Sequence, residues 1–369
     1  MKRVSHIFEK IVTEENISLA IDKASLGKRN QRQVKKILGH KDVYIKMIQG
    51  LLISGSYYPM DPTMLQLRDS RQGKDRIIFK PRFYPDQIVQ WALMLQLQPV
   101  ITKGMYDYCI GSIPNRGIRK GQVTIQKWMK EKTKYCLKMD IRKFYPSVDK
   151  EIIKQKFRKK LKDKRTLDLI DLIIDCNEIG LPIGFYTSQW FANFYLQDLD
   201  HYIKETLHAP FYIRYVDDIV ILGPNKRKLH RIRKGIDAYL GKEHLMVKDN
   251  WQVFPIGYYG KPKGRPIDFL GYKFYKDKTT LRKRNALRWS RRLRRIKKKG
   301  YLTLSDAYAL NSYKGFMKRT NSYNFYQKYY RSITVPRIVK KLVSKNDRAN
   351  NRGDPGYIFD LAERRYKRK

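Results

Sequence analysis

Three acidic residues, Asp140, Asp217 and Asp218, have the types and spacing to bind a divalent cation. Asp217 and Asp218 lie between two apolar stretches, 211–215 and 219–222, which are typical of strands. A hairpin tip would hold the two carboxylates close together, and a bound cation would relieve their mutual repulsion. The alternative is an ordinary Asx turn, because Asp favours tight connections.

Asp140 makes the metal hypothesis stronger. It lies near the end of another apolar strand pattern, 135–141. If that strand neighbours the hairpin in one sheet, Asp140 and Asp217 meet at one edge. Carboxylates, substrate phosphates and water are the ligands that Mg²⁺ prefers. Two such ions, about 3.5–4 Å apart, can activate an attacking 3′ oxygen and stabilise a leaving pyrophosphate. We therefore predict two Mg²⁺ ions, with Mn²⁺ as an alternative.

The charge balance indicates a nucleic-acid partner. Lys and Arg number 80 against 34 Asp and Glu, which gives a formal net charge of +46 and a pI near 10.1. Such an excess drives a protein onto polyphosphates through counterion release, although part of it is an ordinary solvated surface. The 27 Tyr residues could stack on bases, or serve as core residues.

The remaining composition excludes several classes of protein. The three cysteines, Cys109, Cys136 and Cys176, have no CxxC spacing, which argues against a zinc site and a disulfide framework. Met1 precedes a charged stretch and not an apolar signal segment. No apolar run approaches the length of a membrane span. We therefore expect a cytoplasmic protein without a membrane partner.

The elements that must position the acids form a mixed pattern. Helical periodicity marks most of residues 1–70 and several later stretches, namely 86–100, 150–178, 185–202 and 281–345. Besides the strands around the acids, strand patterns lie at 76–79 and 269–274, while 104–121 and 180–184 are typical of loops. This mixture predicts an α+β fold with an all-helical, strongly basic C-terminal part and a polar tail that is partly mobile.

Five motifs in a fixed order resemble those of reverse transcriptases. Tyr215-Val216-Asp217-Asp218 resembles their YxDD box, and the stretch from Asp140 to Tyr145 resembles their first palm motif. The others, which are also similar to family motifs, are the GxxxS stretch 184–189, the fingers strand 76–81 and the primer-grip hairpin 269–272. Together they cover roughly residues 70–275.

The resemblance implies a right-hand polymerase fold with fingers, an antiparallel palm sheet and a helical thumb. It divides the chain into an N-terminal helical region with fingers (1–85), a palm with fingers insertions (86–277) and a basic thumb with a tail (278–369). It implies RNA-directed DNA polymerase activity on dNTPs, with an RNA template and a DNA product. Asp140 and Asp217 would hold the metals, and Asp218 would complete the acidic cluster.

The resemblance also assigns roles on the nucleotide side. Tyr145 would be a steric gate whose ring fills the space of a ribose 2′-OH; the alternative is a core aromatic. Arg76 would contact the triphosphate with bidentate geometry, or would be a surface Arg on a strand. Gly184 would permit close approach of backbone and template. Ser188 and Gln189 could touch the nucleotide or the template, and Ser188 could alternatively be a helix cap. Lys248 is a candidate for protonating the leaving pyrophosphate.

Some features narrow the type of reverse transcriptase. The GxxxS motif here has Ile183 before its glycine and Gln189 after its serine. This form, together with the stretch 312–323, resembles diversity-generating retroelement enzymes and bacterial reverse transcriptases of defence systems. The loop 111–117 departs from the diversity-generating pattern. No later stretch resembles an RNase H domain or an endonuclease tail.

The basic stretch 281–300 is either a solvated face or a docking surface for duplex or structured RNA. The resemblance implies a dedicated non-coding RNA as template, and it leaves open a small accessory protein or self-association. Two rival functions also stay open. One is template-independent or protein-primed DNA synthesis on the same fold. The other is nucleic-acid binding by a retired polymerase, which predicts a broken acidic cluster.

Overall fold

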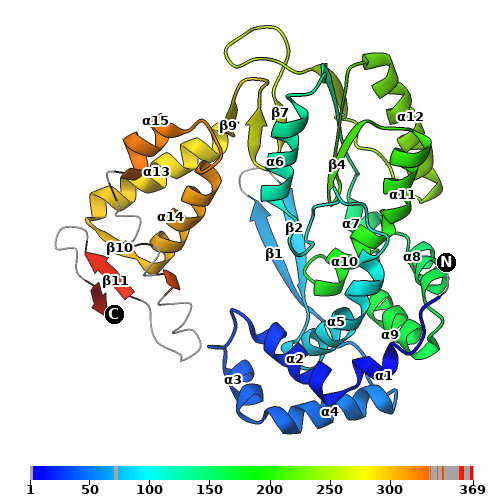
Figure 1. Cartoon of the computed structure of the whole chain (residues 1–369). Helices are drawn as coiled ribbons and strands as arrows, with labels where there is room; N and C mark the ends of the chain where they lie inside the picture. The colour runs from blue at the N-terminus through cyan, green and yellow to red at the C-terminus, as the bar shows by residue number, and fades with distance from the viewer. Residues whose placement is uncertain are drawn as a thin grey trace. The chain divides into compact units, whose positions relative to one another are not determined.

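A computed structural model describes residues 3–69 and 74–331, together with 333, 339, 343, 344 and two short segments, 357–360 and 366–368 (Figure 1). The chain divides into two compact units, Met1–Val253 and Phe254–Lys369, which are described separately. Within the described residues, no helix has the length and apolar character needed to cross a membrane.

The N-terminal part of the first unit is helical up to residue 53, as predicted. Its helices are α1 (Phe8–Ile11), α2 (Glu14–Ser25), α3 (Arg32–Gly39) and α4 (Lys41–Ile53). Thr13 caps α2, because its side chain accepts a hydrogen bond from the Asn16 N–H. The prediction of a mainly helical stretch over residues 1–70 did not include the strand that follows α4. There the chain forms β1 (Thr63–Asp69), which pairs antiparallel with β2 (Lys74–Lys80).

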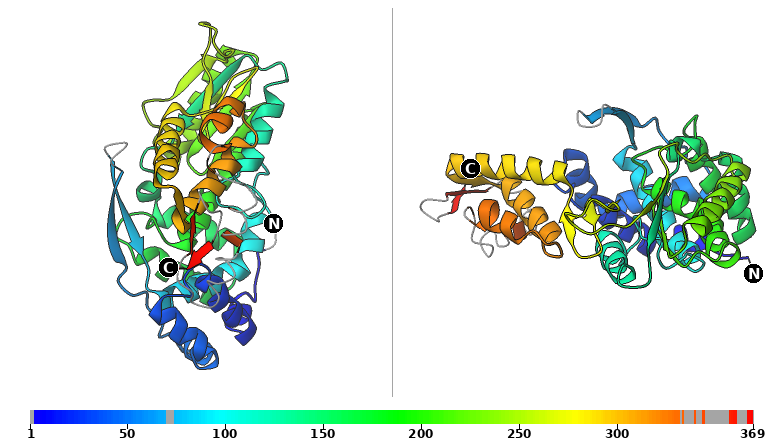
Figure 2. Two further views of the ribbon diagram at one scale, coloured as in Figure 1. Left: turned by 90° about the vertical axis from the view of Figure 1, so that its left-hand side faces the viewer. Right: turned by 90° about the horizontal axis from the view of Figure 1, so that it is seen from above.

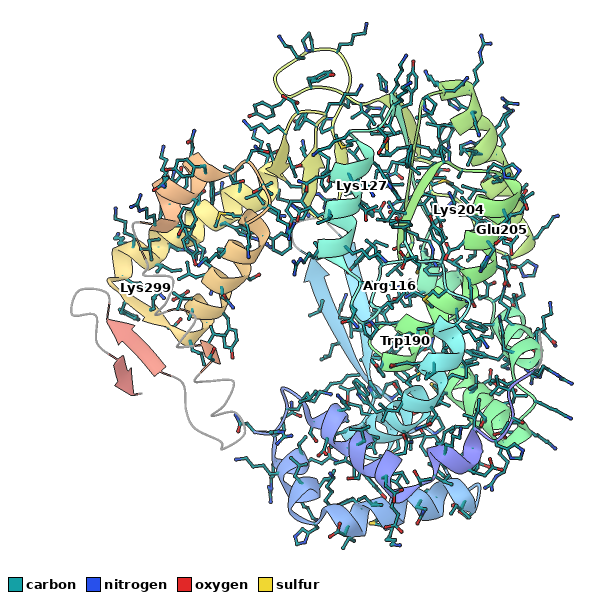
Figure 3. All side chains as sticks on the ribbon, viewed as in Figure 1. Arg116, Lys127, Trp190, Lys204, Glu205 and Lys299 are labelled. Carbon is teal, nitrogen blue, oxygen red and sulfur yellow. The ribbon has the colours of Figure 1, made fainter. Side chains whose placement is uncertain are left out.

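The later helices of this unit begin with the most apolar one, α5 (Ile88–Thr102), which follows the turn η1 (Phe83–Gln87). Both α2 and α10 pack against α5, and Trp190 of α10 is buried in the interior of the unit (Figure 3). Helices α2, α5 and α10 lie in stretches predicted to be helical. The helices at 118–128, 144–147 and 226–242 were not predicted, and the first of them begins inside the predicted loop 104–121. The others are α6 (Ile118–Trp128), α7 (Phe144–Ser147), α8 (Lys150–Lys160), α9 (Lys164–Asp175), α10 (Tyr186–Tyr195), α11 (Gln197–His201), η2 (Tyr202–Thr206) and α12 (Lys226–Lys242).

The sheet of this unit contains the strands predicted around the acidic residues. They are β3 (Tyr135–Asp140), β4 (Phe211–Tyr215) and β5 (Asp218–Gly223), in the order β4-β5-β3, with β6 (Gln252–Pro255) next to β3. Both β3 and β4 run antiparallel to β5. The central strand β5 is buried from its second residue onward, so the sheet forms a rigid platform.

The second unit contains more strand than the sequence predicted. Its first sheet is β7 (Ile267–Phe269), β8 (Tyr272–Phe274) and β9 (Thr279–Leu281). The predicted single strand 269–274 is therefore wrong as a strand, whereas the hairpin resemblance of 269–272 is correct. Leu270 and Gly271 turn the chain with φ of 53° and 88°.

The C-terminal part is not all-helical, which corrects the second prediction for this unit. Helices α13 (Lys283–Lys299) and α14 (Leu304–Met317) are followed by α15 (Tyr323–Phe325) and η3 (Tyr326–Arg331). Between α13 and α14 lies β10 (Tyr301–Thr303), which pairs with β11 (Tyr357–Asp360), itself paired with β12 (Tyr366–Arg368). Gly300, at φ 74°, ends α13 and turns the chain into β10. Most of 332–345 and of the basic tail lies outside the described residues.

Candidate active site

The three acidic residues meet at one edge of the antiparallel sheet. Asp140 ends β3 and is the register partner of Asp218, the first residue of β5. Asp217 and Val216 form the two-residue turn between β4 and β5, and Val216 has a left-handed φ of 57°. The Ile141 N–H donates to the Asp217 carbonyl at 3.3 Å, which fixes the turn against β3. The predicted hairpin and the predicted neighbouring strand are both confirmed.

The carboxylates crowd one another enough to shift a pKa. Burial, followed by the charge of Asp140, raises the pKa of Asp217 to about 7, and a hydrogen bond joins the two carboxyl groups. Two lysines supply the opposite charge. Lys248 Nζ lies 3.4 Å from Asp140 Oδ2, and Lys138 Nζ lies 3.6 Å from Asp218 Oδ2. An additional cation between the carboxylates would therefore lower the electrostatic free energy of the site.

The donor set fits a hard divalent ion. Asp140 and Asp217 offer only carboxylate oxygens, which Mg²⁺ and Mn²⁺ accept, and no thiol or imidazole belongs to the cluster. In the described part of the chain, no three or more His, Cys, Asp or Glu side chains are already arranged around one metal position. Phosphate oxygens and water would therefore have to complete the coordination, as is usual for Mg²⁺.

A buried ion pair behind the hairpin fixes the position of its tip. Arg214 of β4 and Asp200 of α11 are both fully buried. Arg214 donates to both Asp200 oxygens, from Nε at 2.7 Å and from Nη2 at 2.6 Å. Its Nη1 donates to the Val216 carbonyl at 2.8 Å, one residue before Asp217. Tyr212 adds a hydroxyl donor to Asp200 at 2.6 Å. Bidentate charged hydrogen bonds of this kind give geometric precision.

The loop before α6 packs against the same tip. Asn193 accepts from Arg214 Nη1 at 3.2 Å and donates to the Gly111 carbonyl at 2.7 Å. A Cβ on Gly111 would lie 2.6 Å from Val216 Cγ2, so only glycine permits this contact. Arg116 donates to the carbonyls of this loop, and Figure 3 shows where it lies in unit 1. Several residues far apart in the sequence thus position one turn.

Four residues that position this turn could not be predicted as such from the local sequence: Asp200, Arg214, Asn193 and Gly111. The available signal was Arg214 itself, because it is a charged residue in the middle of an apolar strand. A buried Arg almost always needs a buried acidic partner. Which acid serves as that partner depends on the packing of α11 behind β4, and no local pattern indicates that.

Tyr145 lies close to the acidic cluster. It belongs to α7, which follows Lys143 in a left-handed conformation with φ 45°. Burial, followed by the charges of Asp217 and Tyr215, raises the pKa of Tyr145 to about 12. The Leu181 N–H donates to the Tyr145 carbonyl at 2.9 Å, so the loop 180–184 lies beside it. The ring is half-buried and the phenol is neutral at physiological pH.

The residues predicted on the nucleotide side are joined by backbone contacts. The Phe79 N–H of β2 donates to the Ile183 carbonyl at 2.7 Å. Gly184, at φ 120°, packs against the same strand, and a Cβ there would meet the Phe79 carbonyl oxygen. The structural need for Gly184 is therefore the close approach of β2. Arg76 lies in β2 opposite Leu67, and its side chain is outside the described residues.

Helix α10 places the last two predicted residues differently from each other. Ser188 is 2% exposed and Gln189 is exposed. The N-cap of α10 is Phe185, so the alternative role of Ser188 as a cap is wrong. Lys248 is held beside Asp140 by its backbone as well, since its N–H donates to the Asp140 carbonyl at 2.8 Å, and its predicted role stays a prediction.

This region of the chain identifies its family. Residues 73–274 match the profile of the family described as reverse transcriptase (RNA-dependent DNA polymerase). That stretch is more than half of the 369 residues. The chain therefore belongs to the reverse transcriptase family, whose members are RNA-directed DNA polymerases and hence nucleotidyltransferases. The predicted fold class, an α+β right-hand polymerase fold, and the predicted bacterial type of enzyme are confirmed. The predicted boundaries of fingers, palm and thumb stay a prediction.

Two curated relatives come from Escherichia coli. Retron Ec73 reverse transcriptase is 30% identical over 165 residues, which cover 41% of this chain and 50% of the relative. Protein YkfC of strain K12 is 22% identical over 177 residues, which cover 44% of this chain and 46% of the relative. The chain thus spans about half the length of the curated relatives it matches.

Among solved structures, the chain is similar to telomerases. Apo telomerase from Candida tropicalis has a TM-score of 0.48 and 14% identity, over 63% of this chain and 50% of that one. Telomerase from Candida albicans, in complex with the TWJ fragment of telomeric RNA, has a TM-score of 0.46 and 13% identity, over 62% and 46%. These structural similarities are remote.

Proposed function

We propose that this protein makes cDNA on an RNA template by two-metal nucleotidyl transfer. The contact between the Asp140 and Asp217 carboxyl groups, at the edge of an antiparallel sheet in the region matched by the family, carries the proposal. A carboxylate pair of this kind costs free energy in the absence of a cation. A catalytic use of two divalent ions explains why such a pair stands at an otherwise apolar hairpin.

The residues of the chain divide the work of phosphoryl transfer. Mg²⁺ or Mn²⁺, when bound, would activate the primer 3′ oxygen and stabilise the leaving pyrophosphate. Asp140 and Asp217 would hold the ions, and Asp218, paired with Lys138, would keep the local charge negative. Lys248 is close enough to the carboxylates to donate a hydrogen bond or a proton to pyrophosphate.

The choice of sugar would depend on Tyr145. Its half-buried ring is close enough to Asp217 for that charge to raise the pKa of Tyr145, and we expect the sugar of an incoming nucleotide to lie in this region. We propose that the ring excludes a ribose 2′-OH and favours dNTPs. Arg76 would contact the triphosphate from β2, while Gly184 and Gln189 would form the adjacent nucleotide and template side; Ser188 is buried and would not touch either one directly.

The template would be a dedicated non-coding RNA of a retroelement or anti-phage system in a bacterial or phage cytoplasm. The support is the net charge of +46 and the similarity to an enzyme named as a retron reverse transcriptase. Gene neighbourhood tests this setting. A nearby template/variable repeat pair would indicate diversification, and a non-coding RNA gene in a defence island would indicate immunity.

Primer extension on RNA tests the polymerase activity. The purified protein is given an RNA template with an annealed DNA primer, dNTPs and either Mg²⁺ or Mn²⁺, and the products are sequenced. We expect product complementary to the template and a loss of more than about 1,000-fold in Asp217→Ala, because carboxylate ligands are indispensable to this chemistry.

The matched control is Asp237→Ala. Asp237 is an exposed acid on α12 that forms an ion pair with Arg233, at 3.1 Å. This variant should keep activity within about twofold of the wild type. Unchanged incorporation by Asp217→Ala would contradict the catalytic assignment, and product unrelated to the template would contradict templated synthesis.

A further inference from the structure

The second unit has a charge that its own acids do not balance. Residues 254–331 contain 22 Lys and Arg against three Asp. All three acids are engaged within the unit. Asp268 pairs with Arg282, Asp306 pairs with Arg292 and Lys299, and Asp277 accepts the Tyr259 N–H. Within residues 254–331, Lys and Arg thus far outnumber the acids that could neutralise them, which favours a polyanionic partner.

A cavity of about 370 Å³ opens on this unit. This volume lies in the range of small-ligand sites. Among the described residues that line it, none is acidic. The polar ones are Lys278, Thr280, Asn321, Ser322, Tyr323 and Asn324.

The cavity has a fixed frame and an exposed aromatic rim. Asn321 joins β9 through two hydrogen bonds: its N–H donates to the Thr279 carbonyl at 2.8 Å, and its Oδ1 accepts the Thr279 N–H at 2.9 Å. Tyr323, at the start of α15, is 70% exposed. A tyrosine with so much apolar ring in water gains free energy when a flat partner covers it.

Lys278 connects the cavity to a second aromatic group. Its Nζ lies 4.1 Å from the centre of the Tyr259 ring. Tyr259 is 49% exposed, and its ring packs edge-on against Tyr275 at 5.2 Å. Tyr258, beside it, is 51% exposed. The surface thus alternates an exposed ring, a cation, a polar cavity and another exposed ring.

We propose that this surface, formed by Tyr259, Lys278 and the cavity with Tyr323, binds an unpaired stretch of RNA. One unstacked nucleotide enters the cavity and stacks on Tyr323, Lys278 binds the adjoining phosphate, and the next base covers Tyr259. Stacking on aromatic rings combined with cations is the chemistry that retains single strands. The amide and hydroxyl groups of the cavity can bind a 2′-OH, which favours RNA over DNA.

We assign this surface to retention of RNA, because its lining includes no acidic residue that could hold a metal ion for the chemical step. The choice of RNA as the nucleic acid that binds here rests on the proposed RNA-directed activity, and the rest of the inference does not. A duplex keeps its bases stacked and cannot offer one to the cavity. An acidic peptide would satisfy the lysine but not the exposed rings.

Binding of a labelled RNA probe to full-length variants tests this site. The probe is a 20-nucleotide unstructured RNA, compared with the same RNA annealed to its complement and with DNA of the same sequence. Tyr323→Ala should weaken binding of the single-stranded RNA about tenfold, because one stacked base is worth about 1–3 kcal/mol. Lys278→Gln should make the slope of log binding constant against log salt concentration less steep by about 0.7. That change is expected for the loss of one phosphate contact on a single strand.

The matched control is Tyr301→Ala. Tyr301 is also an exposed tyrosine of this unit, at 40%, with Lys299 Nζ 5.3 Å from its ring, and it does not line the cavity (Figure 3 labels Lys299). It should leave the affinity unchanged. Since Tyr323 is exposed, Tyr323→Ala should also unfold at the wild-type temperature, which excludes a folding defect as the cause of weaker binding.

Four results would overturn the inference. The first is that Tyr323→Ala and Tyr301→Ala lose the same affinity for the single-stranded RNA. The second and third are that Tyr323→Ala loses as much affinity for the duplex, or for the DNA, as for the single-stranded RNA. The fourth is that polyglutamate of matched charge fully displaces the RNA probe. Asp217→Ala separates this test from that of the proposed function. It should abolish primer extension and bind the probe like the wild type, so either result can fail without the other.

Discussion

Two hairpins of the first unit carry residues predicted to meet the nucleotide, and they are built in opposite ways. The β4–β5 hairpin is buried along most of its length and is joined to β3 on one side. The β1–β2 hairpin projects from the helices (Figure 2). It exposes apolar side chains on both of its faces, namely Met64 at 68%, Leu65 at 44%, Leu67 at 53% and Ile77 at 51%.

The difference matches what each hairpin is proposed to hold. Metal ligands require positions accurate to a fraction of an ångström, and a buried bidentate ion pair supplies that accuracy. An isolated two-stranded ribbon is marginally stable in water. The β1–β2 ribbon is attached to the rest of the unit through its last residues, at Ile183 and Gly184. We infer that the first hairpin fixes the chemistry and that the second adapts to the substrate.

Breaking the ion pair should have the largest effect on the buried hairpin. Arg214→Met leaves the Asp200 carboxylate buried and unpaired, which costs about 3–5 kcal/mol of folding stability. It also removes the donor to the Val216 carbonyl, so we expect turnover to fall about 100-fold. Thermal unfolding and primer extension measure the two effects.

The double variant Arg214→Met/Asp200→Leu separates position from stability. Replacing both charges with apolar groups should recover most of the lost stability. Turnover should stay low, because no donor holds the hairpin tip. Wild-type turnover in this double variant would show that the pair serves stability alone. Arg158→Met, which breaks a partly exposed pair with Asp171, is the control and should have little effect on turnover.

Tyr145→Ala tests whether the sugar is chosen beside the buried hairpin. Removing the ring should reduce discrimination between dNTPs and rNTPs at least about tenfold, as measured by the ratio of the two kcat/KM values. Tyr145→Phe keeps the ring and should keep the discrimination. If Tyr145→Ala discriminates like the wild type, the choice of sugar is made elsewhere, and the exposed ribbon becomes the candidate.

Gly184→Ala tests the attachment of the exposed hairpin. The added Cβ would collide with the Phe79 carbonyl oxygen and would lie 2.8 Å from Ile78 Cγ2, at a φ of 120°. We expect a loss of about 1–3 kcal/mol of stability and a higher KM for dNTPs, with a smaller change in kcat.

Gly50→Ala is the matched control for that substitution. Gly50 lies inside α4 with no atom within 4 Å of the added Cβ, so alanine should stabilise the protein by about 0.5–1 kcal/mol. A KM effect as large in Gly50→Ala as in Gly184→Ala would refute the proposed role of the attachment.

The smallest expected effect is the pH dependence of metal-free stability. The pKa of Asp217 is raised in the folded protein to about 7. Between about pH 4 and 7 the folded state therefore keeps a proton that the unfolded state has released. Stability should fall as pH rises through this window, by on the order of 1 kcal/mol after solvent screening. Asp217→Asn should remove this slope, and Mg²⁺ should oppose it in the wild type. A metal-free stability that rises over the same window, relative to Asp217→Asn, would contradict the shift.

Local patterns predicted much of the fold and of the candidate site. The strands around Asp140 and Asp217 are short apolar runs, so their positions could be predicted from the sequence. Helices α5, α8, α9, α10, α13 and α14 lie in stretches whose helical periodicity predicted them, whereas α6 and α12 were not predicted. The error at β1 has a physical cause, since Thr63–Asp69 is stabilised by pairing with β2 and not by burial of one face.

The errors in the second unit have a similar cause. The turn at Leu270 and Gly271 divides an apolar run into two strands, and only the left-handed backbone shows it. The three residues of β10 carry too little pattern to indicate a strand, because their partner is more than fifty residues later in the chain. Pairing over that distance depends on the packing of the whole unit.

The sequence by itself determined the kind of chemistry, because that depends on residue types in a fixed order: Asp140, Tyr145 and the pair at 217 and 218. Tertiary structure decided how those residues are held. The partnership of Arg214 with Asp200, the contact of Gly111 with Val216 and the raised pKa of Asp217 all arise from burial. Burial is a property of the folded chain, since it depends on residues that meet only when distant segments pack together.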